Sequence, residues 1–178
     1  RMNTLKNNLL KSIIKSKNTQ SAEELINLEE QSKLIVQSYN KIHDLVKKKT
    51  QGIKANLTRL VESPQHYSEI LIDAQALKVT IDDLKESSVI AHKKHHRYMS
   101  RKQRDYYELM MNYIRAISLS VEIIIDKLQV VILQKQGLNH PKTSRAHSNI
   151  TNSYYAASRR NCNSLAKKLS SYSTLLDS

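Results

Sequence analysis

The chain contains very little glycine and proline. Its 178 residues include only two glycines, Gly52 and Gly137, and two prolines, Pro64 and Pro141. Tight turns, glycine-rich phosphate loops and multi-stranded sheets are built largely from these residues, so their scarcity argues against all three. We therefore predict an all-α protein, in one domain of ordinary size, whose long helices are joined by few connections.

Cysteine and the larger aromatic residues are equally scarce. The lone Cys162 excludes an internal disulfide and every cysteine-based zinc pattern, and it agrees with a reducing compartment such as the cytoplasm. Phe and Trp are absent, so nine tyrosines supply all the aromatic surface. We expect aliphatic residues to fill long helix–helix interfaces, with the tyrosines at the edges and their hydroxyls in water.

Acidic residues are also few. There are 16 Asp and Glu against 29 Lys and Arg, which gives a net charge of +13. This excess favours an anionic partner such as an acidic protein face, anionic lipid or nucleic acid, without choosing among them.

A long uninterrupted apolar run is missing as well. The most apolar stretch, residues 116–133, contains Glu122, Asp126 and Lys127. Each such charge costs about 2.5–3.5 kcal/mol at the centre of a bilayer. We therefore predict no transmembrane helix.

Residues 2–16 have the composition of a short basic amphipathic helix. The side chains that would face a membrane are Leu5, Leu9 and Ile13, with Lys6 and Lys11 beside them. Three interpretations remain open: a first helix packed on the rest of the protein, a helix lying in a membrane interface, or a mitochondrial targeting segment. Arg1 precedes Met2, which suggests a cloning remnant or the cut edge of a longer protein.

Apolar residues at steps of three and four predict four main helices. Their predicted ranges are 21–62, 66–95, 101–136 and 147–176, with a loop at 137–146. Ser21 with Glu24 matches a capping box at the start of the first, and Ser100 with Gln103 matches another at the start of the third. Together with the short helix at 2–16, these helices predict an elongated antiparallel bundle with coiled-coil-like seams, covering residues 1–178 as a single domain.

The seams of the second and third helices do not share a register. Ala91 ends one seam and Met110 begins the next, nineteen residues later, which fits neither a multiple of seven nor a permitted heptad step. The chain therefore either turns near Ser100 or continues as one helix of about 70 residues, about 105 Å long. We favour the turn because average helices are much shorter.

The last predicted helix has the weakest apolar face. That face consists of Ile150, Tyr154, Ala157, Leu165, Leu169, Tyr172 and Leu175. Arg159 and Arg160 lie on its polar side, and we include both among the predicted partner-binding residues.

The stretch 91–105, AHKKHHRYMSRKQRD, has a dense cluster of positive charge. Its cations are Lys93, Lys94, Arg97, Arg101, Lys102 and Arg104. His92 and His96, with His95 alongside, have the spacing of a metal-binding pair. The neighbours are cations and the nearest acids, Glu86 and Asp105, lie on other turns, so we predict no metal or cofactor. The stretch is then either a solvated helix end, with its histidines in water, or an anion-binding surface.

Sequence motifs of catalysis are missing. There is no P-loop, no G-x-S-x-G, no H-E-x-x-H and no dinucleotide fingerprint. We predict a non-enzymatic helical interaction module, an adaptor or scaffold, whose basic helix faces bind another protein or an anionic surface. Its expected location is the cytoplasm, and a homodimer remains open.

Two alternative functions remain open. A basic amphipathic helix ahead of long helices with Lys/Arg clusters resembles the layout of BAR-type membrane-curving proteins, which implies peripheral attachment to anionic lipid. The basic stretch and its tyrosines also allow a nucleic-acid-binding protein.

Overall fold

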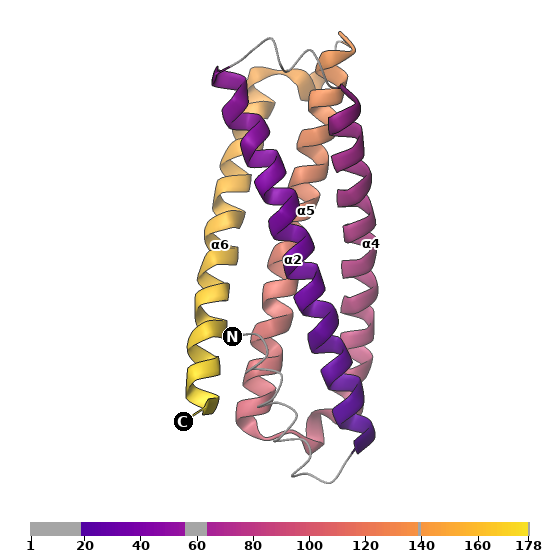
Figure 1. Cartoon of the computed structure of the whole chain (residues 1–178), viewed down its shortest axis with the longest axis vertical. Coiled ribbons are helices and arrows are strands. Elements are labelled where there is room, and N and C mark those ends of the chain that lie inside the picture. The colour runs from indigo at the N-terminus through magenta and orange to yellow at the C-terminus, as the bar shows by residue number, and fades with distance from the viewer. Residues whose placement is uncertain (1–18, 56–63, 139, 178) are drawn as a thin grey trace.

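The computed structural model describes residues 19–55, 64–138 and 140–177. Four long helices form an elongated antiparallel bundle, and the described residues contain no strand (Figure 1). The helices are α2 (Thr19–Ala55), α4 (Pro64–His95), α5 (Arg101–Lys135) and α6 (Arg145–Asp177), with short 3₁₀ helices η1 (His96–Tyr98) and η2 (Pro141–Thr143) in the connections. The predicted all-α antiparallel bundle is confirmed.

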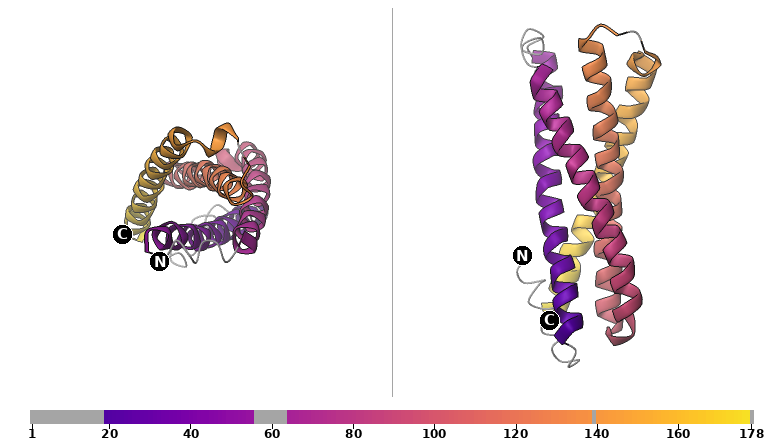
Figure 2. Two further views of the ribbon diagram at one scale, coloured as in Figure 1. Left: turned by 90° about the horizontal axis from the view of Figure 1, so that it is seen from above. Right: turned by 90° about the vertical axis from the view of Figure 1, so that its right-hand side faces the viewer.

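The other three long helices are arranged around α5. This helix packs against α4, α6 and α2, and α2 also packs against α4. Helices α4 and α6 lie on opposite sides of the bundle (Figure 2). None of the described helices combines the length and apolar character needed to cross a bilayer.

The turn between α4 and α5 confirms that residues 66–136 are not one continuous helix. The side-chain oxygen of Ser100 accepts from the backbone N–H of Gln103 at 3.2 Å, and Gln103 Oε1 accepts from the Ser100 N–H at 2.8 Å. This reciprocal pair is the predicted capping box, which satisfies two backbone donors at the start of α5.

The other predicted capping box is wrong. Helix α2 already includes Thr19, so Ser21 lies inside it and is not its N-cap. Glu24 instead directs its carboxylate to α4. The predicted helix at 2–16 and the predicted end of the first main helix at 56–62 lie outside the described residues.

The predicted seams of the first three helices form the core. Ile35 and Tyr39 of α2, Ile81 of α4 and Ile117 of α5 are at most 1% exposed. Each seam places one residue per three or four positions toward the centre, as an amphipathic helix requires. Aliphatic side chains supply most of this interior, as predicted.

The predicted face of the last helix is wrong in its first half. Ile150 and Tyr154 are 51% and 65% exposed, whereas the buried residues there are Thr151, Ser158 and Cys162. The neighbouring surface is polar: the Ser158 hydroxyl donates to Ser120 Oγ of α5 at 3.3 Å. Small residues suit this position because they allow α6 to approach α5 closely and to bond with it.

The prediction that tyrosine hydroxyls stay in water is also wrong for the core. Tyr39, Tyr106 and Tyr107 are each less than 5% exposed. Tyr106 donates to Glu29 Oε1 at 3.2 Å, and Tyr107 donates to the Ser88 carbonyl at 2.7 Å. In a chain without Phe or Trp, tyrosine rings supply the large core volumes, and their buried hydroxyls then need partners inside the protein.

Candidate functional site

The turn from α4 into α5 carries a group of exposed cations, which we call the basic end. It consists of Lys93, Arg97, Arg101, Lys102 and Arg104, all exposed. The group lies at the end of the bundle where α4 ends, α5 begins and the C-terminal part of α6 arrives (Figure 1). The arrangement therefore brings five exposed cations together at one turn, next to the exposed Asp105.

Buried contacts fix the position of this turn. Met99, between η1 and the capping box, is 7% exposed. The hydroxyl of Tyr107 holds α5 to the Ser88 carbonyl of α4, and the ring of His92 stacks on the Tyr107 ring at 5.8 Å between centroids. The cations thus lie on a turn whose position is fixed by contacts with both helices.

Helix α2 contributes a carboxylate that the sequence did not indicate. Glu24 Oε2 is 2.6 Å from His95 Nε2, and Glu24 Oε1 accepts from Lys94 Nζ at 3.0 Å. These bonds, the His95 bond foremost, hold the pKa of Glu24 below its usual range. Lys94 is therefore paired, and we leave it out of the basic end.

The prediction of a fully solvated histidine cluster is wrong for His95, which is 3% exposed. It continues the α4 seam by one further step of four from Ala91. The sequence therefore contains an indication that His95 is buried, because a step of four from Ala91 keeps it on the buried face of the helix. His92 and His96 are exposed, as predicted, and their rings stack on each other at 5.5 Å.

Helix α6 completes the support of the basic end. Tyr172 donates to the backbone carbonyl of Lys102 at 2.6 Å, and its ring lies 6.0 Å from that of Tyr106. A shallow groove beside this contact is lined by Lys167 and Lys168, both exposed. These two lysines extend the positive surface and were missing from the predicted site residues.

A groove between α4 and α5 adjoins the basic end. Its volume is about 320 Å³ and it lies between the two helices just before the turn. Val89 and Met111 give it an apolar floor, while Lys93 and Arg115 add positive charge and Glu108 a negative one. The basic end therefore borders a surface that can also hold an apolar group.

The charges at the start of α5 oppose its helix dipole. Its first turn contains no acidic residue, yet Arg101, Lys102 and Arg104 lie there. The N-terminus of a helix carries a partial positive charge, so each cation near it costs about 0.3–1 kcal/mol at an exposed site. Folding alone gives no reason for this choice of residues.

Arg159 and Arg160 do not join the basic end. Arg159 is half-buried, donates to the Tyr39 hydroxyl at 2.9 Å and lies 5.4 Å from the centre of that ring. Arg160 is exposed, but lies twelve residues, or about 18 Å of helix, before Tyr172, which contacts the turn. The structure therefore uses Arg159 inside the bundle and places Arg160 on a separate surface.

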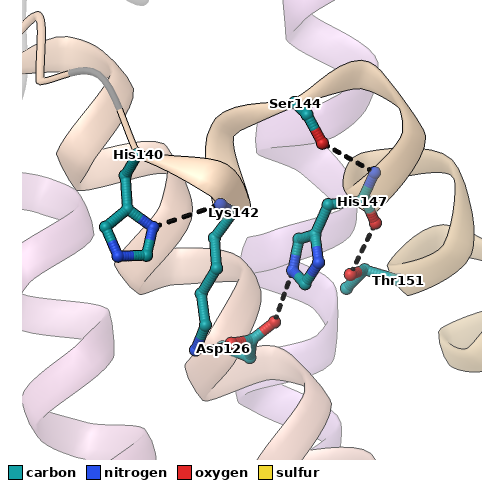
Figure 3. Close-up of polar contacts among 6 residues, drawn as sticks. All are labelled: Asp126, His140, Lys142, Ser144, His147 and Thr151. Atoms are coloured by element: carbon teal, nitrogen blue, oxygen red, sulfur yellow. Dashed lines mark hydrogen bonds and ion pairs between the residues drawn. The ribbon is translucent and has the colours of Figure 1, made fainter.

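The opposite end of the bundle contains a second polar cluster, around Asp126 (Figure 3). Its carboxylate is 3.2 Å from Lys142 Nζ and 3.3 Å from His147 Nε2. Ser144 Oγ accepts from the His147 backbone N–H at 3.1 Å and so caps the start of α6. These bonds join α5 to the α5–α6 connection and to the first turn of α6, which accounts for the cluster structurally. Among the described residues, no group of three or more His, Cys, Asp or Glu is placed to hold a metal ion.

The Glu24 contacts lead to a stability prediction. We expect Glu24→Gln to lower the free energy of unfolding by about 1 kcal/mol at pH 7, because the carboxylate is partly exposed and its two bonds are partly screened. Since folding lowers the pKa of Glu24, its contribution is present above the ordinary value of 4.5 and is lost as the pH falls through the folded value.

Urea unfolding of both proteins at pH 7 and pH 3 measures this effect. The difference between wild type and Glu24→Gln should shrink at pH 3, because Glu24 takes up a proton as the pH falls and loses its ionic contribution. Glu23→Gln, on an exposed neighbour, is the matched control and should have no effect at either pH. An equal loss at pH 3 and pH 7 would contradict an ionic role for Glu24.

Comparison of the chain with protein-family models, with curated proteins and with solved structures finds no match. The interpretation of the basic end therefore depends on its own geometry and charge.

Proposed function

We propose that this chain is a non-enzymatic helical interaction module whose basic end binds an acidic segment of another protein. The observation that carries the proposal is the basic end itself, five exposed cations on a turn that contacts from α4, α5 and α6 hold in place. Cations held in fixed positions lose less conformational freedom on binding than cations on a mobile tail.

The energetics of the first turn of α5 support this proposal. Arg101, Lys102 and Arg104 reduce the stability of the helix that carries them, since they lie at the positive end of its dipole. Residues that oppose local stability are characteristic of functional sites. An anion bound there would interact favourably with both the side chains and the dipole.

The groove between α4 and α5 favours a protein segment over other anions. Its apolar floor, Val89 and Met111, lies beside Lys93, so one ligand can place an apolar side chain in the groove and a carboxylate on the cations. An acidic peptide with an apolar anchor has both groups. Membrane and nucleic-acid binding are the competing outcomes of the test.

The test is binding of three labelled probes to the full chain, measured by fluorescence anisotropy or co-sedimentation. The probes are an acidic peptide containing leucine, vesicles with 30% phosphatidylserine, and a 20-base-pair DNA duplex. We expect Arg97→Glu with Arg101→Glu to weaken peptide binding about tenfold or more, with a helical circular dichroism spectrum like that of the wild type.

The control variant is Lys41→Glu with Arg145→Glu, which makes the same change in net charge at exposed positions elsewhere. It should weaken binding less than about threefold. Equal losses in both variants would mean that net charge alone attracts the probe, and unfolding of the first variant would show that the turn belongs to the core. Preference for vesicles or for DNA would replace the proposal with the corresponding alternative.

A further inference from the structure

Helix α4 carries a second apolar face, directed away from the core. Ile72, Val79 and Ile90 are 63%, 61% and 61% exposed. Together with exposed neighbours at the intervening heptad steps they form a line along the helix, which we call the α4 stripe. The α4 stripe consists of Ile72, Ala76, Val79, Asp83, Glu86 and Ile90. Large exposed apolar side chains in one line mark an interaction surface more often than isolated ones do.

The charge of this surface is unusual for the chain. Asp83 and Glu86 lie on the α4 stripe, and Glu69 and Asp73 are exposed beside its N-terminal half. In a protein of net charge +13, the outer face of α4 is therefore locally acidic.

Helix α6 has an exposed line with the same steps and the opposite charge. This α6 stripe consists of Ile150, Tyr154, Ala157, Asn161, Ser164 and Lys168. Ile150 and Tyr154 are the large side chains that the core leaves out, 51% and 65% exposed. No acidic residue occurs in α6 before Asp177, and Arg160 lies next to the stripe.

We propose that two copies of this chain associate by pairing the α4 stripe of one with the α6 stripe of the next. Both lines follow the alternating steps of four and three that helix pairs use. Within one molecule the two helices lie on opposite sides of the bundle, so its own stripes cannot meet (Figure 2). A second copy is the occupant for which the chain itself supplies complementary charge and matching apolar spacing.

The direction of the helices fits a parallel pairing. Helices α4 and α6 run the same way along the bundle (Figure 1), so two copies side by side in the same orientation bring them together in parallel. In the aligned register Ile72 lies opposite Ile150 and Val79 opposite Ala157. The half of the α4 stripe that contains Asp83 and Glu86 then lies alongside the half of α6 that carries Arg160 and Lys168.

Such an interface is heterologous and leaves a free stripe at each end, so it produces open chains of molecules. One helix pair buries a small area by the standard of stable complexes, so association should be weak, with a dissociation constant of about tens of micromolar. It should also weaken with salt, because part of the attraction is between exposed charges. The inference uses none of the five cations of the basic end; Lys168, which lies in the groove beside them, is the one residue that both proposals involve.

Sedimentation velocity of the full chain from 5 to 200 µM, at 50 and 500 mM salt, tests the pairing. We expect the wild type to sediment faster as concentration rises at 50 mM salt. One variant, Asp83→Lys with Glu86→Lys, and another, Arg160→Glu with Lys168→Glu, should each raise the dissociation constant at least tenfold. An equimolar mixture of the two should restore association, since every interface then joins opposite charges again.

The possible results of this experiment either support the pairing or contradict it. A wild type that stays monomeric at 200 µM and 50 mM salt overturns the inference, as does association that either variant leaves unchanged. Two variants that lose association but do not regain it on mixing show that these stripes do not meet. Circular dichroism of each variant confirms that its helices are intact, and the probe assays of the basic end remain a separate test.

Discussion

Tyr39→Ala is expected to lower the free energy of unfolding by about 3–5 kcal/mol, the range for removing a large aromatic side chain from a core. The side chain of Tyr39 is fully buried at the centre of the bundle. Its hydroxyl lies 2.7 Å from Ser120 Oγ and accepts from Arg159 at 2.9 Å, so the same substitution removes a hydrogen-bonded contact from α5 and from α6.

Tyr39→Phe separates the ring from the hydroxyl. It keeps the volume and should lower the free energy of unfolding by about 1–3 kcal/mol, because polar groups of Ser120 and Arg159 lose a buried partner. Urea unfolding followed by circular dichroism measures both variants. Tyr98→Ala, at a tyrosine that is 46% exposed, is the control and should have little effect. Equal small effects for Tyr39→Ala and Tyr98→Ala would contradict the described core.

Arg159 provides an independent check of the same contact. If its guanidinium serves the interior, Arg159→Met should be destabilising, and its effect should not add to that of Tyr39→Phe, since the two groups bond to each other. A neutral Arg159→Met that weakens probe binding would instead support the sequence prediction that Arg159 faces a partner.

The contact belongs to a polar layer that crosses the bundle. Tyr39 and His43 of α2 reach Arg159 and Tyr155 of α6, and Ser120 of α5 lies between them. Hydrogen bonds of this kind have fixed partners, whereas aliphatic seams tolerate sliding. The layer therefore sets the register in which α2, α5 and α6 pack.

The aliphatic seams were predictable from the sequence, but this polar layer was not. Spacing of Ile, Leu and Val by three and four identifies a buried face because burial of such side chains is the main local signal. Thr151, Ser158 and Cys162 carry no such signal, and the apolar pattern instead predicts the exposed Ile150 and Tyr154 as the buried face of α6. Ser158 bonds to the Ser120 hydroxyl of α5, and Cys162 lies 3.9 Å from the Tyr39 hydroxyl of α2; the local sequence pattern contains neither partner.

The candidate site was also only partly predictable from the sequence. The exposure of its cations could be predicted, since a dense run of Lys and Arg stays in water. The turn could be located from the break in register between the two seams and from the Ser100 capping box. The carboxylate of Glu24 could not, because it comes from 71 residues before His95. Which cations remain available to a partner depends on such long-range contacts, which bond Lys94 to Glu24 and Arg159 to Tyr39.

The buried tyrosines also predict a steep loss of stability at alkaline pH. Burial raises the pKa of Tyr39, Tyr106, Tyr113 and Tyr155, and it raises the pKa of Tyr107 to about 12. The folded protein thus keeps protons that unfolded tyrosines lose above pH 10. Stability is unaffected by these groups below pH 10 and falls as the pH rises toward the folded values.

The size of this effect follows from the number of groups. Each proton retained by the folded state changes stability by about 1.4 kcal/mol per pH unit, so Tyr106, Tyr107 and Tyr155, whose pKa values burial raises most, give roughly 4 kcal/mol per unit. Since domains are stable by about 5–15 kcal/mol, we expect the bundle to unfold between about pH 11 and 12. Lys78 acts in the same direction, because its bonds to Asp82 and Glu122 raise its pKa and are lost on deprotonation.

Circular dichroism at 222 nm and tyrosinate absorbance at 295 nm, recorded in one alkaline titration, test this expectation. Most of the absorbance should appear together with the loss of helix, because the buried hydroxyls ionise only when the bundle opens. Tyr107→Phe should reduce the slope of stability against pH by about 1.4 kcal/mol per unit, whereas Tyr98→Phe, at an exposed position, should not. Ionisation of most tyrosines before any loss of helix would place their hydroxyls in water, as the composition alone had suggested.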